Sequence, residues 1–315
     1  MTQEFNHTPV MVSEVVAMFE PVPAGVFIDA TVGGGGHAAA LLDRFPDQEL
    51  VGLDVDEDAV AEAASRLSRF GVRARVVKAR FDEMADVVDD LAPGRAIVGA
   101  LFDLGVSSPQ LDRPGRGFSY RFDGPLDMRM DRSLRTTAAD LVNSLSVGEL
   151  SELFAENGEG RFARTLAEGI VSNRPIETTS QLVEVVQHCL PGVARKRAGH
   201  PAKRVFQALR IAVNEELEVL ATGLETALGL LTPGGRCVVL SYHSGEDRLV
   251  KRSFLDAETG GCTCPVGLPC VCGAKGTVRV LTRGARLAST AEKAVNPRAG
   301  SARLRAAERL VGDGV

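Results

Sequence analysis

The sequence contains no apolar run that approaches the ~20 residues needed to cross a membrane. Its first ten residues include Glu4 and lack the apolar core of an export signal. We therefore expect a cytoplasmic protein, and in that compartment its six cysteines should stay reduced. Internal repeats and low-complexity tracts are also missing, which excludes solenoid and fibrous architectures.

An overall excess of positive charge is missing as well. The net charge is −5 over 315 residues, so the whole molecule lacks the basic footprint of a nucleic-acid-binding protein. Basic residues do cluster in the tail at residues 275–309 and in a second group, which consists of Arg195, Lys196, Arg197, Lys203, Arg204 and Arg210. Two such patches could hold a phosphate backbone, or they could be solvated helix faces. The sequence leaves both interpretations open.

Strand-like and helix-like segments alternate through the first hundred residues. Apolar runs that are typical of buried strands occupy residues 26–28, 50–54, 72–77 and 96–102. Helical spacing of apolar residues occurs at 8–19, 57–70 and 82–91. The alternation predicts an α/β protein with a Rossmann-like, doubly wound parallel sheet.

The alternation stops at about residue 104, and no convincing strand follows before about residue 203. Capping boxes at Ser146 with Glu149 and at Thr178 with Gln181 predict helices there. A long helix is expected over 204–231, and the sheet resumes with a strand at 237–241. These features predict a core in two parts, residues 1–105 and 204–315, with an inserted helical subdomain at 106–203.

The stretch Asp-Ala-Thr-Val-Gly-Gly-Gly-Gly-His, residues 29–37, organises the first part of the core. Four consecutive glycines suit neither a helix nor a strand interior, but they suit a loop whose backbone touches a ligand. His37 and the alanines after it then begin a helix whose first N–H groups point back at this loop. The alternative is a flexible glycine turn with no ligand.

Three predicted strands end in an acid, at Asp29, Asp54 and Asp103. Ligands of open α/β sheets bind outside the carboxyl ends of the strands. Three carboxylates there suit a ligand with a ribose and a positive charge, such as S-adenosylmethionine, and they would repel a bare triphosphate. The Gly-x-x-x-x-Gly-Lys-Ser/Thr pattern of nucleotide triphosphate sites is absent. A nicotinamide dinucleotide is the main rival, because Gly33, Gly35 and Ala38 match its loose glycine pattern.

The segment Asp-Leu-Gly-Val-Ser-Ser-Pro, residues 103–109, follows the fourth strand. A carboxylate and a neighbouring carbonyl on a rigid turn could accept the N–H groups of an exocyclic amine. Such contacts would align the nitrogen with the methyl group that it attacks. An ordinary turn capped by serine and proline is the alternative.

At these residues the chain resembles the bacterial 16S ribosomal RNA (cytosine-N4)-methyltransferase family, RsmH (MraW). The resemblance covers nearly the whole chain. Its motifs are His-Thr-Pro-Val at 7–10, the glycine segment at 29–37, the stretches at 103–112, 116–120, 125–131 and 206–211, and His243-Ser244 followed by Glu246-Asp247-Arg248.

The resemblance implies S-adenosylmethionine as methyl donor, a cytidine at the decoding centre of 16S RNA as acceptor, and a helical insertion that helps to hold the RNA. The expected partner is thus 16S rRNA in the small ribosomal subunit, with no membrane and no DNA, and a homodimer is left open. The implied donor contacts are Gly35, Gly36, His37, Asp54 (ribose), Phe81 (adenine), Asp103 (nearest the transferred group, and catalytic) and Gln110. A non-catalytic RNA-binding assembly factor and a dinucleotide-dependent oxidoreductase are the other functional hypotheses.

Other amino-methyltransferases place an aromatic residue where this chain has Gln110. A stacking partner for the cytosine must therefore come from elsewhere, and Phe118, Tyr120 and Tyr242 are the candidates.

Four cysteines lie within eleven residues, as Cys262-x-Cys264 and Cys270-x-Cys272. Closely spaced thiols in a reducing compartment are typical of a structural zinc site. The spacing is tighter than the usual two-residue gap, so unligated thiols in a loop are the alternative. A catalytic metal is not expected, because methyl transfer needs none.

Overall fold

The computed structural model describes residues 9–190, 202–265 and 271–311, and within them the chain forms two compact units. The first unit comprises Met1–Gly105 and Leu217–Val315, and the second is the intervening segment Val106–Glu216. The second break differs from the expected one, since it falls after Glu216 and not after Lys203. The reason is that α11 (Ala202–Val213) buries its apolar face in the core of the second unit.

The first unit is built on an eight-stranded sheet in the order β3-β2-β1-β4-β5-β8-β6, with β7 paired to β8. The strands β1 to β5 run parallel, whereas β8 runs antiparallel to β5, β6 and β7. The strands are β1 (Val26–Asp29), β2 (Glu49–Asp54), β3 (Ala74–Lys78), β4 (Ile97–Asp103), β5 (Leu231–Ser241), β6 (Val278–Val280), β7 (Arg286–Leu287) and β8 (Arg303–Arg309). The expected Rossmann-like parallel sheet is confirmed.

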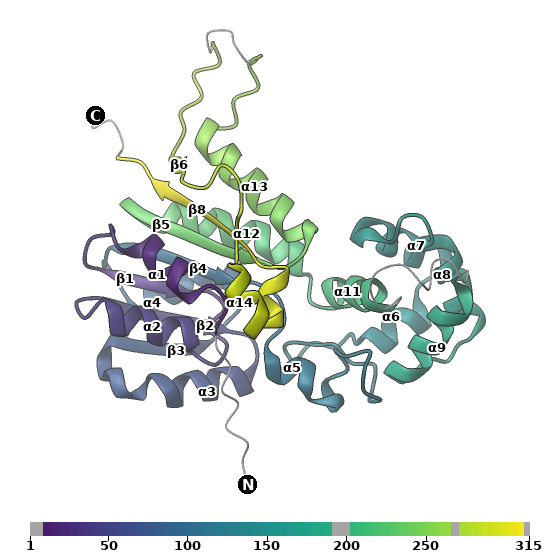
Figure 1. Cartoon of the computed structure of the whole chain (residues 1–315). Helices are drawn as coiled ribbons and strands as arrows, with labels where there is room; N and C mark the ends of the chain where they lie inside the picture. The colour runs from purple at the N-terminus through teal and green to yellow at the C-terminus, as the bar shows by residue number, and fades with distance from the viewer. Residues whose placement is uncertain (1–8, 191–201, 266–270, 312–315) are drawn as a thin grey trace. The chain divides into compact units, whose positions relative to one another are not determined.

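Helices cover both faces of this sheet (Figure 1). Along β1, Phe27 belongs to one apolar core and Val26 and Ile28 belong to the other, because successive side chains of a strand point to opposite faces. The first core receives α1 (Val12–Phe19), α2 (Gly36–Arg44) and α3 (Glu57–Leu67), and the second receives α4 (Met84–Leu91), α12 (Glu216–Leu230) and α13 (Ser244–Thr259). None of the helices in the described part of the chain has the length and apolar character of a bilayer span.

The prediction of a single long helix over 204–231 is wrong, because Asn214 and Glu215 separate α11 from α12. Glu215 has a φ of 51°, a left-handed conformation that ends a right-handed helix. The Asn214 side chain bonds a distant loop: its Nδ2 donates to the Met128 carbonyl at 2.9 Å, and its Oδ1 accepts from the Met130 N–H at 2.7 Å. This tertiary contact accounts for a break that apolar spacing alone does not reveal.

The regular elements in the described part of the second unit are helices, joined by loops and one isolated bridge between Pro125 and Thr178. Its apolar core gathers side chains from most of its helices, namely α5 (Ser108–Asp112), α6 (Ala138–Ser144), α7 (Val147–Phe154), α8 (Ala163–Ser172), α9 (Thr179–Cys189) and α11. Both expected capping boxes are confirmed, since the Ser146 and Thr178 hydroxyls accept from the backbone N–H groups of Glu149 and Gln181. A third capping box, at Thr137, begins α6.

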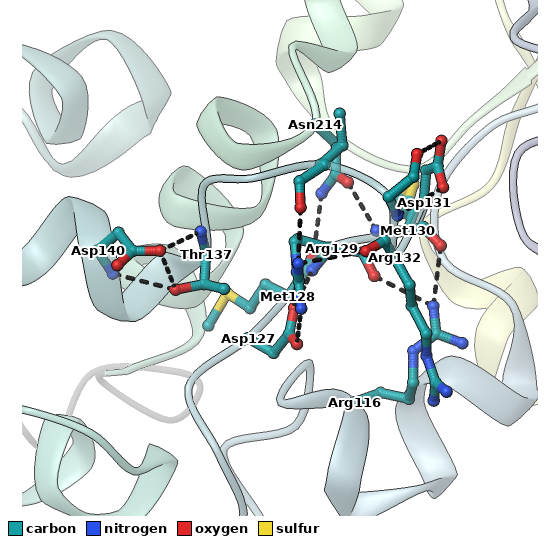
Figure 2. Close-up of polar contacts among 12 residues, drawn as sticks. Arg116, Asp127, Met128, Arg129, Met130, Asp131, Arg132, Thr137, Asp140 and Asn214 are labelled. Atoms are coloured by element: carbon teal, nitrogen blue, oxygen red, sulfur yellow. Dashed lines mark hydrogen bonds and ion pairs between the residues drawn. The ribbon is translucent and has the colours of Figure 1, made fainter.

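A polar network fixes the loop at residues 125–131 within this unit, as Figure 2 shows. Arg116 donates to the carbonyls of Arg129 and Met130 at 3.1 and 3.0 Å. Arg129 also pairs with the Asp127 carboxylate at 2.8 Å. Burial alone would raise the pKa of Asp127, but the hydrogen bonds from Arg129 outweigh it and hold this pKa below its usual value. Arg116, Asp127 and Arg129 therefore hold the loop at residues 125–131 in place.

Part of the positive charge in the C-terminal tail is neutralised inside the first unit. Arg305 is buried and donates to Asp247 at 2.7 Å, and Arg303 reaches the same carboxylate at 3.0 Å. Arg279 pairs with Glu308 at 2.7 Å. The tail also includes α14 (Thr290–Val295) and the strands β6 to β8, so much of it completes the sheet.

The other basic cluster is only partly described. Arg195, Lys196 and Arg197 lie outside the described residues. Arg210 of α11 forms a bidentate ion pair with Glu216, in which both hydrogen bonds are 2.7 Å long. This guanidinium is thus committed to the fold of the second unit.

Candidate functional site

The candidate site lies at the carboxyl ends of β1, β2 and β4. The strand β1 pairs with β2 on one side and with β4 on the other, so the strand order reverses between β1 and β4. Ligands of open α/β sheets bind at such a switch point. Asp29, Asp54 and Asp103 are the last residues of these three strands. The three acids that the sequence assigns to strand ends therefore share one edge of the sheet.

The glycine loop crosses this edge in a tight path. The Val32 N–H donates to the Leu53 carbonyl at 2.8 Å, which ties the loop to the end of β2. Gly35 has a φ of 75° and stands directly before α2, where a residue with a side chain would be strained. A Cβ on Gly36 would lie 2.3 Å from Cγ of Pro9. Glycine is thus required at both positions by the local backbone and packing.

Asp54 is held by the backbone of two loops. Its Oδ2 accepts from the Gly33 N–H at 2.9 Å, and its Oδ1 accepts from the Asp56 N–H, also at 2.9 Å. Burial nevertheless raises the pKa of Asp54 to about 6, because these backbone hydrogen bonds only partly offset the loss of water. A ligand hydroxyl or positive charge at this carboxylate would favour its ionised form.

Asp103 is fixed from three directions. Its N–H donates to Oγ1 of Thr31 at 2.6 Å, and its Oδ1 accepts from the Tyr242 hydroxyl at 2.6 Å. Its Oδ2 lies 3.4 Å from Nε2 of His37. Burial and the neighbouring Asp103 carboxylate raise the pKa of Tyr242, so this phenol stays protonated and donates. The carboxylate at the end of β4 therefore has one well-defined orientation.

Thr31 and Tyr242 are partners of Asp103 that no sequence motif predicts. Thr31 follows β1, and Tyr242 follows β5, the strand next to β4. A polar residue within two positions of the end of a neighbouring strand is the signal that could have identified both, once the strand order was known. Tyr242 is also one of the three candidate stacking residues, and its hydroxyl donates to Asp103.

Asp29 is a buried acid with few compensating contacts. Its side chain is 1% exposed, and its Oδ1 accepts a long bond of 3.3 Å from the Thr31 N–H. Burial, reinforced by repulsion from Asp103 and Asp54, raises the pKa of Asp29 to about 7, although His37 opposes the shift. The edge thus holds more negative charge than its surroundings balance, which suits a cationic ligand and disfavours an anionic one.

His37 is the basic group that lies beside Asp29 and Asp103 at this edge. Its ring is 5% exposed, and Nδ1 has no hydrogen-bond partner among the described residues. Burial would lower the pKa of His37, but the carboxylates of Asp103 and Asp29 outweigh it and raise this pKa. An unpartnered buried nitrogen beside the carboxylates of Asp103 and Asp29 fits S-adenosylmethionine, which offers a ribose, an amine and a positive sulfur.

Phe81 lies at the start of the short turn after β3, in the same unit. Its ring packs edge-on against Phe102 with centroids 5.6 Å apart, and a Cβ on Gly223 of α12 would lie 2.6 Å from it. No described contact joins Phe81 to the three acids. The structure therefore brings Gly33, His37, Asp54 and Asp103 together, with Phe81 as a partly exposed ring near the end of β3.

Gln110 belongs to the second unit and lies in α5. Its Oε1 accepts from the Ser107 N–H at 3.0 Å, so this side chain caps the helix. Two of the expected stacking residues also lie in this unit. Phe118 is buried in its core, whereas Tyr120 is partly exposed and packs edge-on against Phe206. Tyr120 thus keeps part of its ring accessible, and Phe118 does not.

Comparison with known proteins gives a consistent result over nearly the whole chain. A family model described as "MraW methylase family" matches residues 4–310. A protein of Symbiobacterium thermophilum is 50% identical over 311 residues, 97% of each chain, and one of Geobacter sulfurreducens is 50% identical over 97% of this chain and 99% of its own. A Heliobacterium modesticaldum protein is 45% identical over 97% and 99%. All three are named "Ribosomal RNA small subunit methyltransferase H".

Proposed function

The chain belongs to the MraW methylase family, and from this premise we propose that it methylates N4 of a decoding-centre cytidine in 16S ribosomal RNA. S-adenosylmethionine is the methyl donor, and the small ribosomal subunit provides the RNA. The observation that carries the proposal is the oriented Asp103 carboxylate at the switch point of the sheet. An N–H acceptor at that position is what amino-group methylation requires.

We propose that the donor site in the first unit consists of Gly35, Gly36, His37, Asp54, Phe81 and Asp103. S-adenosylmethionine supplies a methyl group that is bonded to a positively charged sulfur. An amine nitrogen can attack the carbon of this methyl group. Asp54 accepts hydrogen bonds from the ribose hydroxyls. Its carboxylate can do so because it has lone pairs left after accepting from the N–H groups of Gly33 and Asp56. The unbalanced negative charge of Asp29 and Asp103 favours the positive ligand.

Asp103 acts on the acceptor as a catalytic residue. Its carboxylate accepts an N–H of the exocyclic amine and so turns the nitrogen lone pair towards the methyl group. Tyr242 and His37 act as positioning residues, because they hold the two carboxylate oxygens in one orientation. Most of the rate gain then comes from alignment, which is lost when the carboxylate is lost or moves.

The second unit, Val106–Glu216, is proposed to hold the RNA. A base must leave its stack before its amino group can react, and an extruded base is stabilised by stacking on an aromatic ring. Tyr120 is the proposed stacking residue, because its ring is partly exposed while Phe118 is buried. Exposed basic side chains such as Lys203 and Arg286 would contact phosphates and position the strand.

The substrate determines where the reaction takes place. Small ribosomal subunits are a cytoplasmic substrate, so we place the activity in the cytoplasm. The chain acts as a monomer or a homodimer, and sedimentation of the purified protein distinguishes the two.

The test is transfer of labelled methyl from S-adenosylmethionine to small subunits that lack the modification, followed by mapping of the labelled base. We expect label at N4 of one decoding-centre cytidine. Absence of label on subunits and on naked 16S RNA, while the donor still binds, would overturn the proposal in favour of a non-catalytic assembly factor. Stabilisation of the protein by NAD and not by S-adenosylmethionine would favour an oxidoreductase.

A further inference from the structure

The segment between α13 and β6 is closed at its base by two glycines. A Cβ on Gly276 would lie 2.0 Å from the Glu258 carbonyl oxygen, and one on Gly260 would lie 2.4 Å from the Lys275 carbonyl oxygen. The outgoing and returning chains therefore touch backbone to backbone at the end of α13. Figure 1 shows the chain leaving α13 and returning to β6 beside it.

Three cysteines converge just beyond this base. The Sγ atoms of Cys262, Cys264 and Cys272 all lie within 4.8 Å of one another, and those of Cys262 and Cys272 are 3.5 Å apart. None of these side chains is buried. Cys237, by contrast, is fully buried in the sheet core, where a thiol behaves as a small apolar side chain. Apolar packing therefore does not explain why three accessible thiols gather at one point.

We propose that Cys262, Cys264 and Cys272 bind a Zn²⁺ ion that holds this segment together. Zinc–sulfur bonds of about 2.3 Å at tetrahedral angles place the sulfurs about 3.8 Å apart, close to the separations of this cluster. Zinc prefers soft thiolate ligands, and the three described thiols supply three of its four positions. The fourth coordination position is filled by a ligand other than these three side chains.

The three Sγ atoms all lie within 4.8 Å of one another, which is close enough for them to share one metal ion. A disulfide between Cys262 and Cys272 is the competing chemistry, since their sulfurs are the nearest pair. A disulfide would leave Cys264 without a role, whereas a metal uses all three thiols.

The site is separate from the methyl-transfer site. It lies between α13 and β6, and its cysteines make no described contact with Asp54 or Asp103. The metal therefore has a structural role, in which binding replaces the apolar core that this exposed segment lacks. Failure of this proposal would leave the proposed methyltransferase function intact, and the reverse also holds.

The test measures metal content of the full chain, purified with a reductant and without chelators. We expect about one zinc per chain in the wild type, and loss of that zinc in the triple variant Cys262→Ser, Cys264→Ser, Cys272→Ser. Cys189→Ser is the matched control, because Cys189 lies in α9 outside the cluster, and it should keep the zinc. Equal metal in wild type and triple variant, or none in the wild type after reconstitution, would overturn the proposal.

Two further measurements separate zinc from the disulfide. Cobalt substituted into the metal-free wild type should give the thiolate-to-metal absorption bands of a tetrahedral site, and each single Cys→Ser variant should weaken them. Protein alkylated before unfolding is then analysed by mass spectrometry for the Cys262–Cys272 bond. A stoichiometric disulfide in freshly prepared protein would also overturn the zinc proposal.

Discussion

Two groups of acids in this chain are held in opposite ways. At the sheet edge, burial raises the pKa of Asp54 to about 6 and that of Asp29 to about 7. In the second unit Asp127 is also partly buried, yet its hydrogen bonds with Arg129 keep its pKa below the usual value. Both groups belong to conspicuous sequence motifs, at residues 29–37 and 125–131. Their electrostatic environments assign them different roles.

The difference shows which motif stabilises the protein and which prepares it for a ligand. Asp127 has a guanidinium partner at 2.8 Å, so its ionised form stabilises the loop. Asp29 and Asp54 have no Lys or Arg partner among the described residues, so their ionisation is unfavourable until a ligand supplies positive charge or hydroxyl groups. Acids held in this unfavourable way are typical of functional sites.

The largest expected effect comes from Asp103→Asn. Asparagine keeps the shape of the side chain but loses the charge, and we expect methyl transfer to fall by about 100-fold or more because the acceptor amine is no longer aligned. Initial rates at saturating donor and subunit measure the loss. Asp127→Asn is the matched control from the other group, and its rate per folded molecule should stay near that of the wild type. Equal losses of activity in the two variants would show that the acids of the sheet edge and Asp127 do not differ in their roles.

The next effect concerns stability and the loop at 125–131. Asn214→Ala leaves the buried Met128 carbonyl and Met130 N–H without their partners, so the free energy of unfolding should fall by about 2–3 kcal/mol. Urea unfolding gives the value. Asn173→Ala is the control, because the exposed Asn173 amide bonds only a carbonyl of its own helix. A change no larger than that control would show that Asn214 does not fix the loop.

The pH dependence of donor binding should reveal the raised pKa values directly. Below pH 6 Asp54 and Asp29 are mostly protonated, and the cationic donor must release these protons to bind. We expect the Kd for S-adenosylmethionine to rise about 100-fold between pH 8 and pH 5.5. Calorimetry in buffers of different ionisation enthalpy measures both affinity and proton release. Asp29→Asn should remove the part of the dependence near pH 7, and a pH-independent Kd would contradict this account.

The same groups predict opposite trends for the ligand-free protein. Asp29 and Asp54 bind protons more tightly when folded than when unfolded, so their contribution to stability falls as the pH rises from about 4 through 7. Asp127 binds its proton less tightly when folded, so its contribution is complete above the unfolded pKa of 3.8 and is lost at lower pH. Unfolding of Asp29→Asn and Asp127→Asn across this range separates the two trends.

The smallest effect is expected for Tyr242→Phe. The ring still fits beside Gly105, and only the hydroxyl that donates to Asp103 is lost. One neutral donor contributes about 1 kcal/mol, so kcat should fall by about fivefold while KM for the RNA stays unchanged. Tyr120→Phe keeps the stacking ring and is the control. A loss as large as that of Asp103→Asn would mean that Tyr242 takes part in the chemistry and does not merely orient Asp103.

Local patterns in the sequence determined many elements of both units. Buried strands such as residues 26–28 and 50–54 are short and mostly apolar, and four consecutive glycines favour a loop because they stabilise neither a helix nor a strand. The capping boxes at Ser146 and Thr178 involve residues only three positions apart. Each of these features depends on neighbours in the chain, which is why a single sequence revealed them. The acids at three strand ends followed from the same local logic.

Only the tertiary structure decided which of these residues meet. The bond between Tyr242 and Asp103 joins residues 139 apart, and the ion pair of Arg305 with Asp247 depends on the insertion of β8 between β5 and β6. Asn214 ends its helix because of a loop 84 residues away, where apolar spacing favours a continuous helix. Hydrophobic periodicity reports which face of an element is buried, but not which strand or loop it is buried against. That choice depends on strand order and register, which the packing of the whole chain determines.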